Sequence, residues 1–203
     1  LEGGAGAVVT SSGMAAVTLV AHLLKAGELA LVPRDCYGGT FRLFTALARQ
    51  GLIRVEFIDP TDFAALEGAL AAKPRLVWLE APSNPLLRIT DLQRCAAAAH
   101  AVGALVAADN TFLSPVWQQP LALGADVVIH STTKYLNGHS DVVGGAVIAK
   151  ERALHDELAW WANCLGLTGA PFDSFLTLRG LRTLHARLGL HEANAQAVAE
   201  SLR

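Results

Sequence analysis

The chain has 203 residues, of which 52% are hydrophobic and 17% are charged, and it carries a formal net charge of -2. This length suits one large domain, or one domain and part of another. The near-neutral charge argues against nucleic acid as the main partner, and no apolar run approaches the roughly 18 residues needed to cross a membrane. The three cysteines are odd in number and widely spaced, which favours reduced thiols in a cytoplasmic protein.

Short apolar runs alternate along the chain with segments of helical character. Strands are expected over residues 29–33, 54–59, 75–80, 104–110, 126–131 and 143–149, which are rich in Val, Ile and Leu. Because these runs are continuous rather than alternating, we expect helices to cover both faces of the sheet that they form. The alternation of strands and helices predicts an α/β protein with three layers, α/β/α, and a mostly parallel sheet.

The expected helices lie near residues 13–26, 39–51, 62–72 and 91–103. Thr61 or Asp62 suits one helix N-cap, Thr90 with Asp91 suits another, and helix ends are expected at Gly27, Gly51 and Gly103. After about residue 150 the pattern changes, and helices are expected over 151–163 and through most of 171–203. The start of the chain is expected to lie within a core helix and loop.

Ligands bind at the carboxyl ends of the strands in sheets of this kind, and candidate residues cluster there. The small-residue loop 11-SSGMAA-16 opens a helix, so its backbone N–H groups could hold a phosphate, although an ordinary helix N-cap explains the same residues. Tyr37 precedes two glycines that let a ligand approach the backbone, although a turn with a half-buried tyrosine fits as well. Arg42 is either a ligand contact or a solvated charge on a helix face.

A second pair of candidates follows two later strands. Asp109 ends the run 105-LVAAD-109, which is expected to be a central strand. A carboxylate there is costly unless it meets a cation or hydrogen-bond donors, and the alternative is an aspartate that caps a helix or braces a loop. Asn84, between Ser83 and Pro85, is either a site residue or part of a turn.

The stretch 130-HSTTKYLNGHSD-141 places one lysine, Lys134, among hydroxyl side chains after an expected strand. A lysine, an anion-binding loop, a strand-end carboxylate and a tyrosine together suit pyridoxal phosphate, which needs an amine for its aldehyde and an acid for its pyridine nitrogen. A metal site built from His130, His139 and Asp141 lacks any metal-binding spacing, so no metal is predicted. His139 and Asp141 are instead expected to brace the loop after Lys134.

Six stretches carry a resemblance to a known family: DCYGGTFRLF, EAPSNPLLRITDL, DNTFLSP, PLALGADVVIHSTTKYLNGHSDVVGG, ELAWWAN and FLTLRGLRTL. Through them the chain resembles, from end to end, the Cys/Met-metabolism group of fold-type-I pyridoxal-phosphate enzymes. The resemblance implies the large cofactor domain of an aspartate-aminotransferase-like fold over residues 1–170, without the family's N-terminal arm. Residues 171–203 are then expected to form a helical lead toward the family's C-terminal domain.

The resemblance also implies roles for single residues. Lys134 is expected to form the Schiff base with pyridoxal 5'-phosphate and to carry the substrate proton, and Asp109 is expected to pair with the pyridine nitrogen. Tyr37 is expected to stack on the cofactor ring and to help move protons. We expect Lys134 to be buried, which would favour its neutral, reactive form.

The remaining implied contacts concern the phosphate and the substrate. The side chains of Ser131 and Thr133, with the backbone of Gly13 and Met14, are expected to hold the cofactor phosphate. Asn84 is expected to contact the cofactor's phenolic oxygen or the substrate carboxylate. Arg42 is similar to an arginine that binds the distal carboxylate of the substrate in some members of the family.

Two features point to a reaction within the family: DCYGG followed by Arg42, and LAWWAN before GLTGAPFDS. They most resemble the members that catalyse γ-replacement, so the expected reaction converts O-succinylhomoserine and cysteine to cystathionine and succinate. γ-Elimination and sulfide addition, catalysed by other members, remain open, as does an inactive fragment that only binds the cofactor or a protein partner. The resemblance further implies small amino-acid substrates and a cytoplasmic homotetramer, a dimer of dimers, without nucleic-acid or membrane partners.

Overall fold

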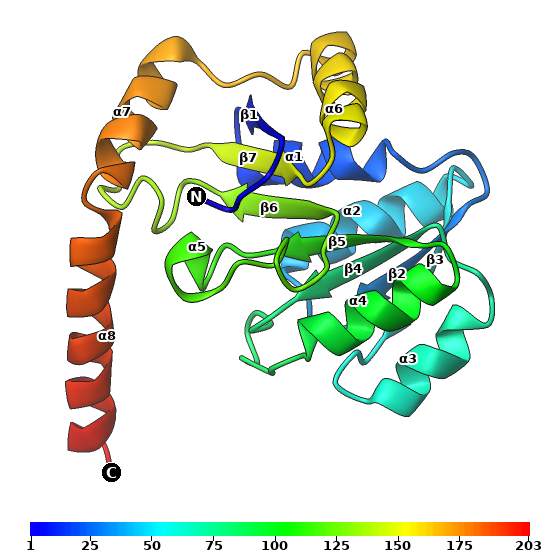
Figure 1. Cartoon of the computed structure of the whole chain (residues 1–203), viewed down its shortest axis with the longest axis horizontal. Helices are drawn as coiled ribbons and strands as arrows, with labels where there is room; N and C mark the ends of the chain where they lie inside the picture. Colours follow the sequence, from blue (N-terminus) through cyan, green and yellow to red (C-terminus); the bar gives the residue numbers. More distant parts are fainter.

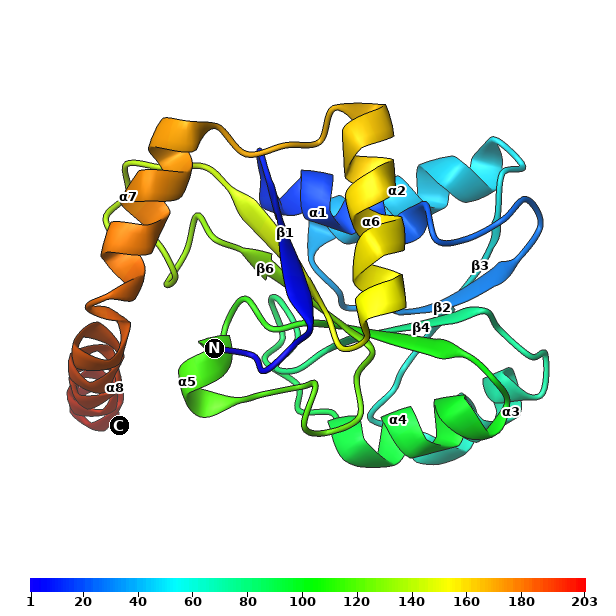
Figure 2. The same ribbon diagram turned by 45° about the horizontal axis from the view of Figure 1, so that its top comes forward.

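The computed structural model describes all 203 residues and contains one seven-stranded sheet between two layers of helices (Figures 1 and 2). The strand order is β1-β7-β6-β5-β4-β2-β3. The strands are β1 (Gly6–Thr10), β2 (Leu29–Pro33), β3 (Arg54–Ile58), β4 (Leu76–Glu80), β5 (Leu105–Asp109), β6 (Val127–Ser131) and β7 (Gly145–Ala149). The helices are α1 (Gly13–Ala21), α2 (Gly38–Arg49), α3 (Phe63–Leu70), α4 (Leu92–Ala101), α5 (Ser114–Trp117), α6 (Arg152–Leu165), α7 (Pro171–Leu181) and α8 (Leu184–Ser201).

The sheet is mostly parallel, as predicted. Strands β2 to β6 pair in parallel, and β7 runs antiparallel to both of its neighbours, β6 and β1. The expectation of a core helix and loop at the start of the chain is wrong for residues 6–10, which form β1. This strand is partly exposed on alternate residues and is only five residues long, so it lacks the continuous apolar run that marked the inner strands.

Both faces of the sheet are covered by helices, which confirms the three-layer prediction. Helices α1, α2 and α6 pack on one face, where Phe44 of α2 and Leu158 of α6 join a buried cluster with Trp78 of β4. Helices α3 and α4 pack on the other face, where Leu66 and Cys95 join Leu79 of the same strand. The two clusters hold 20 and 19 buried residues, so the sheet is buried about equally from its two sides.

The predicted starts of α3 and α4 and the predicted ends at Gly51 and Gly103 are confirmed by hydrogen bonds and backbone angles. The prediction that the first helix ends at Gly27 is wrong, because α1 ends at Ala21. Asp62 accepts from the backbone of α3, and Asp91 accepts from the backbone of α4. Gly51 and Gly103 follow α2 and α4 with φ values of 71° and 80°, a region that glycine adopts without strain. These local signals therefore fix where the crossover helices of the parallel sheet begin and end.

The last part of the chain is helical but not one helix. Helices α7 and α8 are separated at residues 182–183, and α8 extends away from the sheet (Figure 1). Near its start, the guanidinium of Arg187 donates to the carbonyl groups of Tyr135, Leu136 and Gly180. Arg187 thus fastens α8 to the loop that follows Lys134. None of the helices in the structure combines the length and apolar character needed to cross a membrane.

Candidate active site

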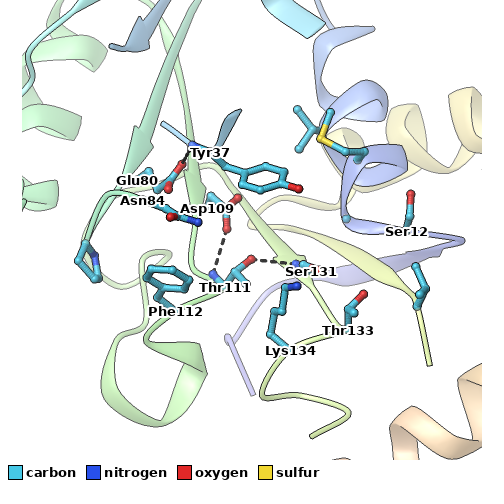
Figure 3. Close-up of a pocket in the computed structure, with 15 residues that line it drawn as sticks. Ser12, Tyr37, Glu80, Asn84, Asp109, Thr111, Phe112, Ser131, Thr133 and Lys134 are labelled. Atoms are coloured by element: carbon cyan, nitrogen blue, oxygen red, sulfur yellow. Dashed lines mark hydrogen bonds between the residues drawn. The ribbon is translucent and has the colours of Figure 1, made fainter. Parts of the chain in front are cut away.

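A cavity of about 300 Å³ lies at the carboxyl ends of β4, β5 and β6, beside the N-terminus of α1 (Figure 3). This is the end of a parallel sheet at which ligands are expected. Eight residues predicted from the sequence line the cavity together: Gly13, Met14, Tyr37, Asn84, Asp109, Ser131, Thr133 and Lys134. The other residues that line it are Ser12, Val17, Glu80, Pro82, Thr111, Phe112 and Val143.

Lys134 lies in a turn just after β6, and its side chain points into the cavity (Figure 3). Its backbone N–H donates to the carbonyl of Ser131 at 3.3 Å, and its own carbonyl accepts from Gly138 at 2.8 Å. The expectation that Lys134 is buried is wrong, because the residue is exposed. It also borders a shallower, open hollow lined by Asp141 and His191, so solvent reaches the lysine from that side.

The loop after Lys134 is held by polar contacts, as predicted for His139 and Asp141. The buried Asn137 donates from its side chain to Asp141 Oδ1 at 2.7 Å, and His139 Nδ1 donates to the Asn137 carbonyl at 2.6 Å. Together with Arg187, these bonds limit the movement of the loop in which Lys134 stands. The bracing role of His139 and Asp141 is confirmed.

The first turn of α1 forms one end of the cavity. The Ser12 side chain accepts from the backbone N–H of Ala15 at 3.0 Å and caps the helix, while the first N–H groups of a helix lack partners within it. The helix approaches β6 so closely that a Cβ added to Gly13 would lie 2.8 Å from Cβ of Ser131. Thr133 exchanges hydrogen bonds with the backbone of Gly144, which orients its hydroxyl. Unpaired N–H groups, a helix dipole and hydroxyls at one place suit an anion.

Gly13→Ala tests this close approach. Because the new methyl group collides with Ser131, we expect α1 to move away from β6 and the affinity for pyridoxal phosphate to fall about tenfold, a loss typical of one disturbed charge-assisted hydrogen bond. The matched control is Gly68→Ala in α3, where an added Cβ meets nothing within 4 Å. We expect that control to keep its affinity, measured by equilibrium titration of the cofactor. Equal affinities for the two variants would contradict a role for the α1 N-terminus.

The opposite end of the cavity is acidic. Asp109 ends β5, and its Oδ1 accepts from the backbone N–H of Thr111 at 3.0 Å. Asp109 is half-buried and lines the cavity. Burial raises the pKa of Asp109, while the hydrogen bonds from Thr111 and the nearby His130 oppose the rise. No cationic group forms a salt bridge with Asp109 in the structure, so a ligand with a positively charged N–H fits this end of the cavity.

Glu80 is a site residue that the sequence reasoning missed. It pairs in register with Asp109 across β4 and β5, is buried, and accepts from the backbone N–H of Tyr37 at 2.9 Å. The pKa of Glu80 is raised from 4.5 to about 8, mainly by burial and in addition by the charge of Asp109. The signal available beforehand was the position of Glu80, a carboxylate at the end of a predicted buried strand. The strand order that makes it a neighbour of Asp109 was not predictable from that position.

Glu80→Gln should change how stability depends on pH. The folded state holds the Glu80 proton up to a pH of about 8, whereas the unfolded chain releases it near 4.5, so the folded state binds more protons between these values. The free energy of unfolding of the wild type therefore falls as the pH rises from about 4.5 to about 8. We expect the glutamine variant to lose most of this dependence, as measured by urea unfolding of the cofactor-free protein at several pH values. An unchanged slope would contradict the burial argument.

Tyr37 and Asn84 approach the cavity from two loops. The Tyr37 ring extends over the cavity (Figure 3), and Gly39 lies so near that an added Cβ would be 2.6 Å from Tyr37 Cε1. Asn84 lies in the loop after β4, beside Glu80 and Asp109 in Figure 3. Arg42 is not brought into the cavity. It lies on the exposed side of α2 and lines a separate surface hollow with Phe41 and Arg49.

Known proteins resemble this chain over its whole length. The family model described as Cys/Met metabolism PLP-dependent enzyme matches residues 1–203. Cystathionine gamma-synthase of Escherichia coli (strain K12) is 58% identical over 204 residues, which cover 100% of this chain and 53% of that protein. The chain therefore spans about half the length of the relatives that it matches.

Two solved structures also resemble the fold of this chain. The crystal structure of cystathionine gamma synthase from Xanthomonas oryzae pv. oryzae in complex with cystathionine is 61% identical with a TM-score of 0.98, over 99% of this chain and 52% of that chain. A cystathionine gamma-lyase from Lactobacillus plantarum, complexed with L-serine, is 41% identical with a TM-score of 0.96, over 99% and 53% of the two chains. On this similarity, the chain belongs to the family of Cys/Met-metabolism enzymes that depend on pyridoxal phosphate.

Proposed function

We propose that this chain is the cofactor-binding part of an enzyme that catalyses γ-replacement, converting O-succinylhomoserine and cysteine to cystathionine and succinate. The observation that carries the proposal is that the highest identities, 58% and 61%, are to two cystathionine γ-synthases. Identity is 46% to the γ-synthase of Mycobacterium bovis, and 45% and 41% to the γ-lyases of Dictyostelium discoideum and L. plantarum. The X. oryzae γ-synthase and the L. plantarum γ-lyase share the fold of this chain with TM-scores of 0.98 and 0.96, so they differ from it in residues and not in architecture.

The residues present fit pyridoxal phosphate on two observations of the structure. Helix α1 can approach Ser131 this closely only because Gly13 has no Cβ, and the approach brings unpaired helix N–H groups to the same end of the cavity as the hydroxyls of Ser131 and Thr133. At the other end, the Asp109 carboxylate has no cationic partner. An anion-binding end and a cation-binding end separated by an aromatic side chain match a phosphorylated pyridine. When bound, the cofactor supplies an electron sink for the negative charge that develops on a substrate carbon.

In this proposal six residues hold the cofactor. The hydroxyl groups of Ser131 and Thr133 would bind the phosphate, together with the backbone N–H groups of Gly13 and Met14. Asp109 accepts from the pyridine N–H and keeps that nitrogen protonated, which strengthens the electron sink. The Tyr37 ring packs on the pyridine face.

Lys134 and the remaining residues act on the substrate. The Lys134 amine would bind the cofactor aldehyde and would serve as the base that takes the proton from the substrate Cα. The Tyr37 hydroxyl helps to move protons. Asn84 binds the cofactor's phenolic oxygen or the substrate carboxylate, and Arg42 binds the distal carboxylate of the substrate. Arg42 does not line the cavity, but its guanidinium lies beside Gly38, the chain neighbour of Tyr37, which supports this last assignment.

A product assay tests the proposed reaction. The purified protein is loaded with pyridoxal phosphate and given O-succinylhomoserine with cysteine, with sulfide, or alone. We expect cystathionine and succinate in the first reaction, and slower or no turnover in the others. Production of 2-oxobutyrate and ammonia without cystathionine would instead support γ-elimination, the second candidate, which the 41% identity to a γ-lyase favours. Cofactor binding without any turnover would support a chain that serves only as a cofactor-binding or interaction domain.

We also propose how this unit is organised and assembled. Residues 1–170 form the cofactor-binding domain, and residues 171–203 lead away from it. The large exposed apolar side chains of Trp160, Phe172 and Phe175 support a homotetramer, a dimer of dimers, in which these faces are covered. The free cysteines support a cytoplasmic location. Light scattering coupled to size-exclusion chromatography measures the mass of the assembly, and a monomer at micromolar concentration would contradict the tetramer.

A further inference from the structure

The turn that carries Lys134 is held by the first turns of α8, through the side chain of Arg187. Its guanidinium donates from Nη1 to the Tyr135 carbonyl at 2.9 Å and from Nη2 to the Leu136 carbonyl at 3.4 Å. The same group donates to the Gly180 carbonyl at 2.9 Å, near the end of α7. One side chain therefore ties the two residues that follow Lys134 to the junction of α7 and α8.

The shape of the turn and the charge of Arg187 both suit this contact. A Cβ added to Gly138 would collide with Nη1 and Cζ of Arg187, so the guanidinium fits only beside a glycine. Arg187 is half-buried, which lowers its pKa, and it forms no ion pair with a carboxylate. Because the guanidinium still stays charged, its hydrogen bonds to the carbonyls are stronger than bonds between neutral groups.

Apolar contacts hold the same turn against α8. Leu136 is buried together with Leu184 and Leu188 of α8 in a small cluster. The Tyr135 ring meets the His191 ring edge-on, with 5.6 Å between the two centroids. This cluster is separate from the two clusters that bury the sheet. The turn therefore depends on α8, and not on the sheet, for its packing.

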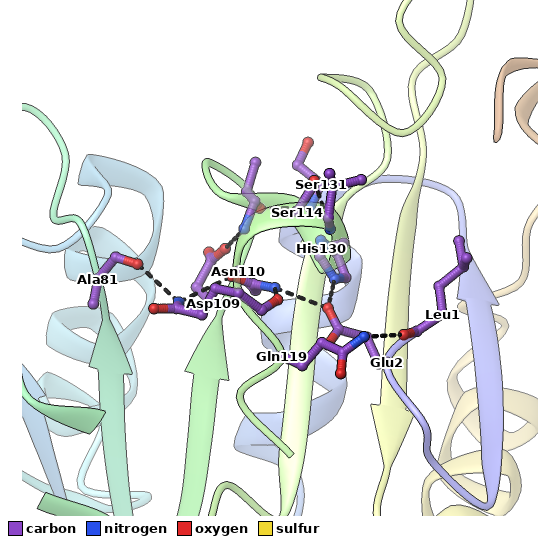
Figure 4. A network of polar contacts seen from close by, with 12 residues as sticks. Leu1, Glu2, Ala81, Asp109, Asn110, Ser114, Gln119, His130 and Ser131 are labelled. Carbon is purple, nitrogen blue, oxygen red and sulfur yellow. Dashed lines mark hydrogen bonds and ion pairs between the residues drawn. The ribbon is translucent and has the colours of Figure 1, made fainter. Parts of the chain in front are cut away.

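The strand before the turn is fixed without α8 (Figure 4). The backbone N–H of Ser131 donates to Thr111 Oγ1 at 2.8 Å. The buried Glu2 carboxylate accepts through Oε1 from His130 Nε2 at 2.7 Å and from Asn110 Nδ2 at 2.9 Å. These bonds join the end of β6 to β5 and to the first residues of the chain. The turn after β6 thus begins at a fixed strand end and is completed by contacts with α8.

The direction of the Lys134 side chain depends on the backbone of this turn. Lys134 is exposed, and its amine forms no salt bridge that would hold it in place. The Lys134 carbonyl accepts from the backbone N–H of Gly138 at 2.8 Å. Since Gly138 is also the residue against which Arg187 packs, a movement of Arg187 would be passed directly to the lysine.

We propose that Arg187 is a positioning residue for the proposed reaction, and that it holds the turn so that the Lys134 amine reaches the cofactor aldehyde and the substrate Cα. The inference rests on the proposed role of Lys134. Arg187 does not line the cavity, so it acts through the lysine and touches neither the cofactor nor the substrate. A reacting group that is displaced by about 1 Å can lose about a hundredfold in rate, which makes such support consequential.

Arg187→Met tests the proposal, because methionine keeps an apolar stem and removes every donor. Two probes separate the lysine from the rest of the cavity: pyridoxal phosphate, and pyridoxine 5'-phosphate, which has no aldehyde. Attachment of the amine to the aldehyde releases one water, and borohydride reduces the C=N bond to a C–N bond that intact mass detects. We expect attachment to slow about tenfold to a hundredfold in the variant. The affinity for pyridoxine 5'-phosphate, measured by calorimetric titration, should stay unchanged.

Two further variants make the comparison specific. Arg182→Met is the matched control, since Arg182 is exposed between α7 and α8 and should behave as the wild type with both probes. Arg187→Lys keeps the charge but lacks the planar fork, so its attachment rate should lie between those of Arg187→Met and wild type. It gives the same comparison should Arg187→Met fail to fold.

Three results would overturn the proposal. The first is an equal attachment rate in wild type and the Arg187 variants. The second is an equal loss of affinity for both probes, because it would show that the whole cavity is disturbed. The third is the absence of attachment in the wild type, which would refute the proposed role of Lys134 itself and is thereby distinguished from a failure of Arg187 alone.

Hydrogen exchange of the cofactor-free chain, followed by NMR, gives a readout that needs no ligand. The backbone N–H of Gly138 should exchange at least about tenfold faster in Arg187→Met than in wild type, because its bond to the Lys134 carbonyl opens more often. The amides of β6 should keep their wild-type rates. Equal acceleration at Gly138 and in β6 would indicate a general loss of stability and would contradict a local role for Arg187.

Discussion

Replacing Lys134 with alanine is expected to abolish covalent attachment of pyridoxal phosphate and to reduce turnover at least about a thousandfold. The variant removes both the amine that binds the aldehyde and the base that takes the substrate proton, and general acid–base catalysis alone contributes about 10²–10⁴. Borohydride reduction followed by intact-mass measurement tests the attachment. We expect the wild type to gain the mass of one reduced cofactor and Lys134→Ala to gain none, with loss of the visible absorbance of the bound cofactor.

The matched control is Lys150→Ala. Lys150 is exposed and follows β7 at the opposite end of that strand from the cavity, so its removal should change neither attachment nor turnover. Because Lys134 itself is exposed, its substitution should leave the fold intact. Identical spectra and masses for Lys134→Ala and wild type would show that another amine binds the cofactor.

Asp109→Asn is expected to have the second largest effect on turnover, a fall of about a thousandfold, comparable to losing one preorganised electrostatic contact in an enclosed site. The amide can still accept the hydrogen bond from Thr111, but it has no charge to keep the pyridine nitrogen protonated. Steady-state kinetics with excess cofactor measures the loss. The exposed substitution Asp156→Asn on α6 is the control and should behave as the wild type.

The same Asp109 substitution should stabilise the cofactor-free protein. The pKa of Asp109 is raised in the folded state, so the carboxylate lowers the stability of the wild type as the pH rises above the unfolded-state value of 3.8. At neutral pH the uncharged asparagine avoids the free-energy cost of burying a carboxylate. We therefore expect a higher melting temperature for cofactor-free Asp109→Asn than for wild type at pH 7.5, and a difference that shrinks as the pH is lowered. A lower melting temperature at neutral pH would contradict a destabilising carboxylate.

Much of the fold was predictable because the inner strands carry strong local signals. Strands β2, β4, β5 and β6 are continuous apolar runs, and Asp62 and Asp91 mark the starts of two crossover helices. The edge strand β1 lacked such a run. The break between α7 and α8 was not predicted, because residues 182–183, which separate the two helices, include neither glycine nor proline. It occurs where Gly180 packs directly on the backbone of Asn137, a contact between distant parts of the chain.

The sequence by itself determined which chemical groups are available at the strand ends. The lysine after β6, the carboxylate that ends β5 and the small-residue start of α1 each follow from a local pattern, and the structure brings them to one cavity. Their spacing along the chain also carried the resemblance to the family. These features depend on residues close in sequence, so strand and helix signals are sufficient to place them.

Only the tertiary structure decided which of these groups meet, and in what surroundings. Pairing of β4 with β5 makes Glu80 a neighbour of Asp109, while the surface position of α2 leaves Arg42 outside the cavity. The open hollow beside Lys134 exposes the amine that was expected to be buried. Glu2 reaches His130 across 128 positions because β1 and β7 return the first residues to the sheet. Burial and charge depend on such long-range neighbours, which no local pattern specifies.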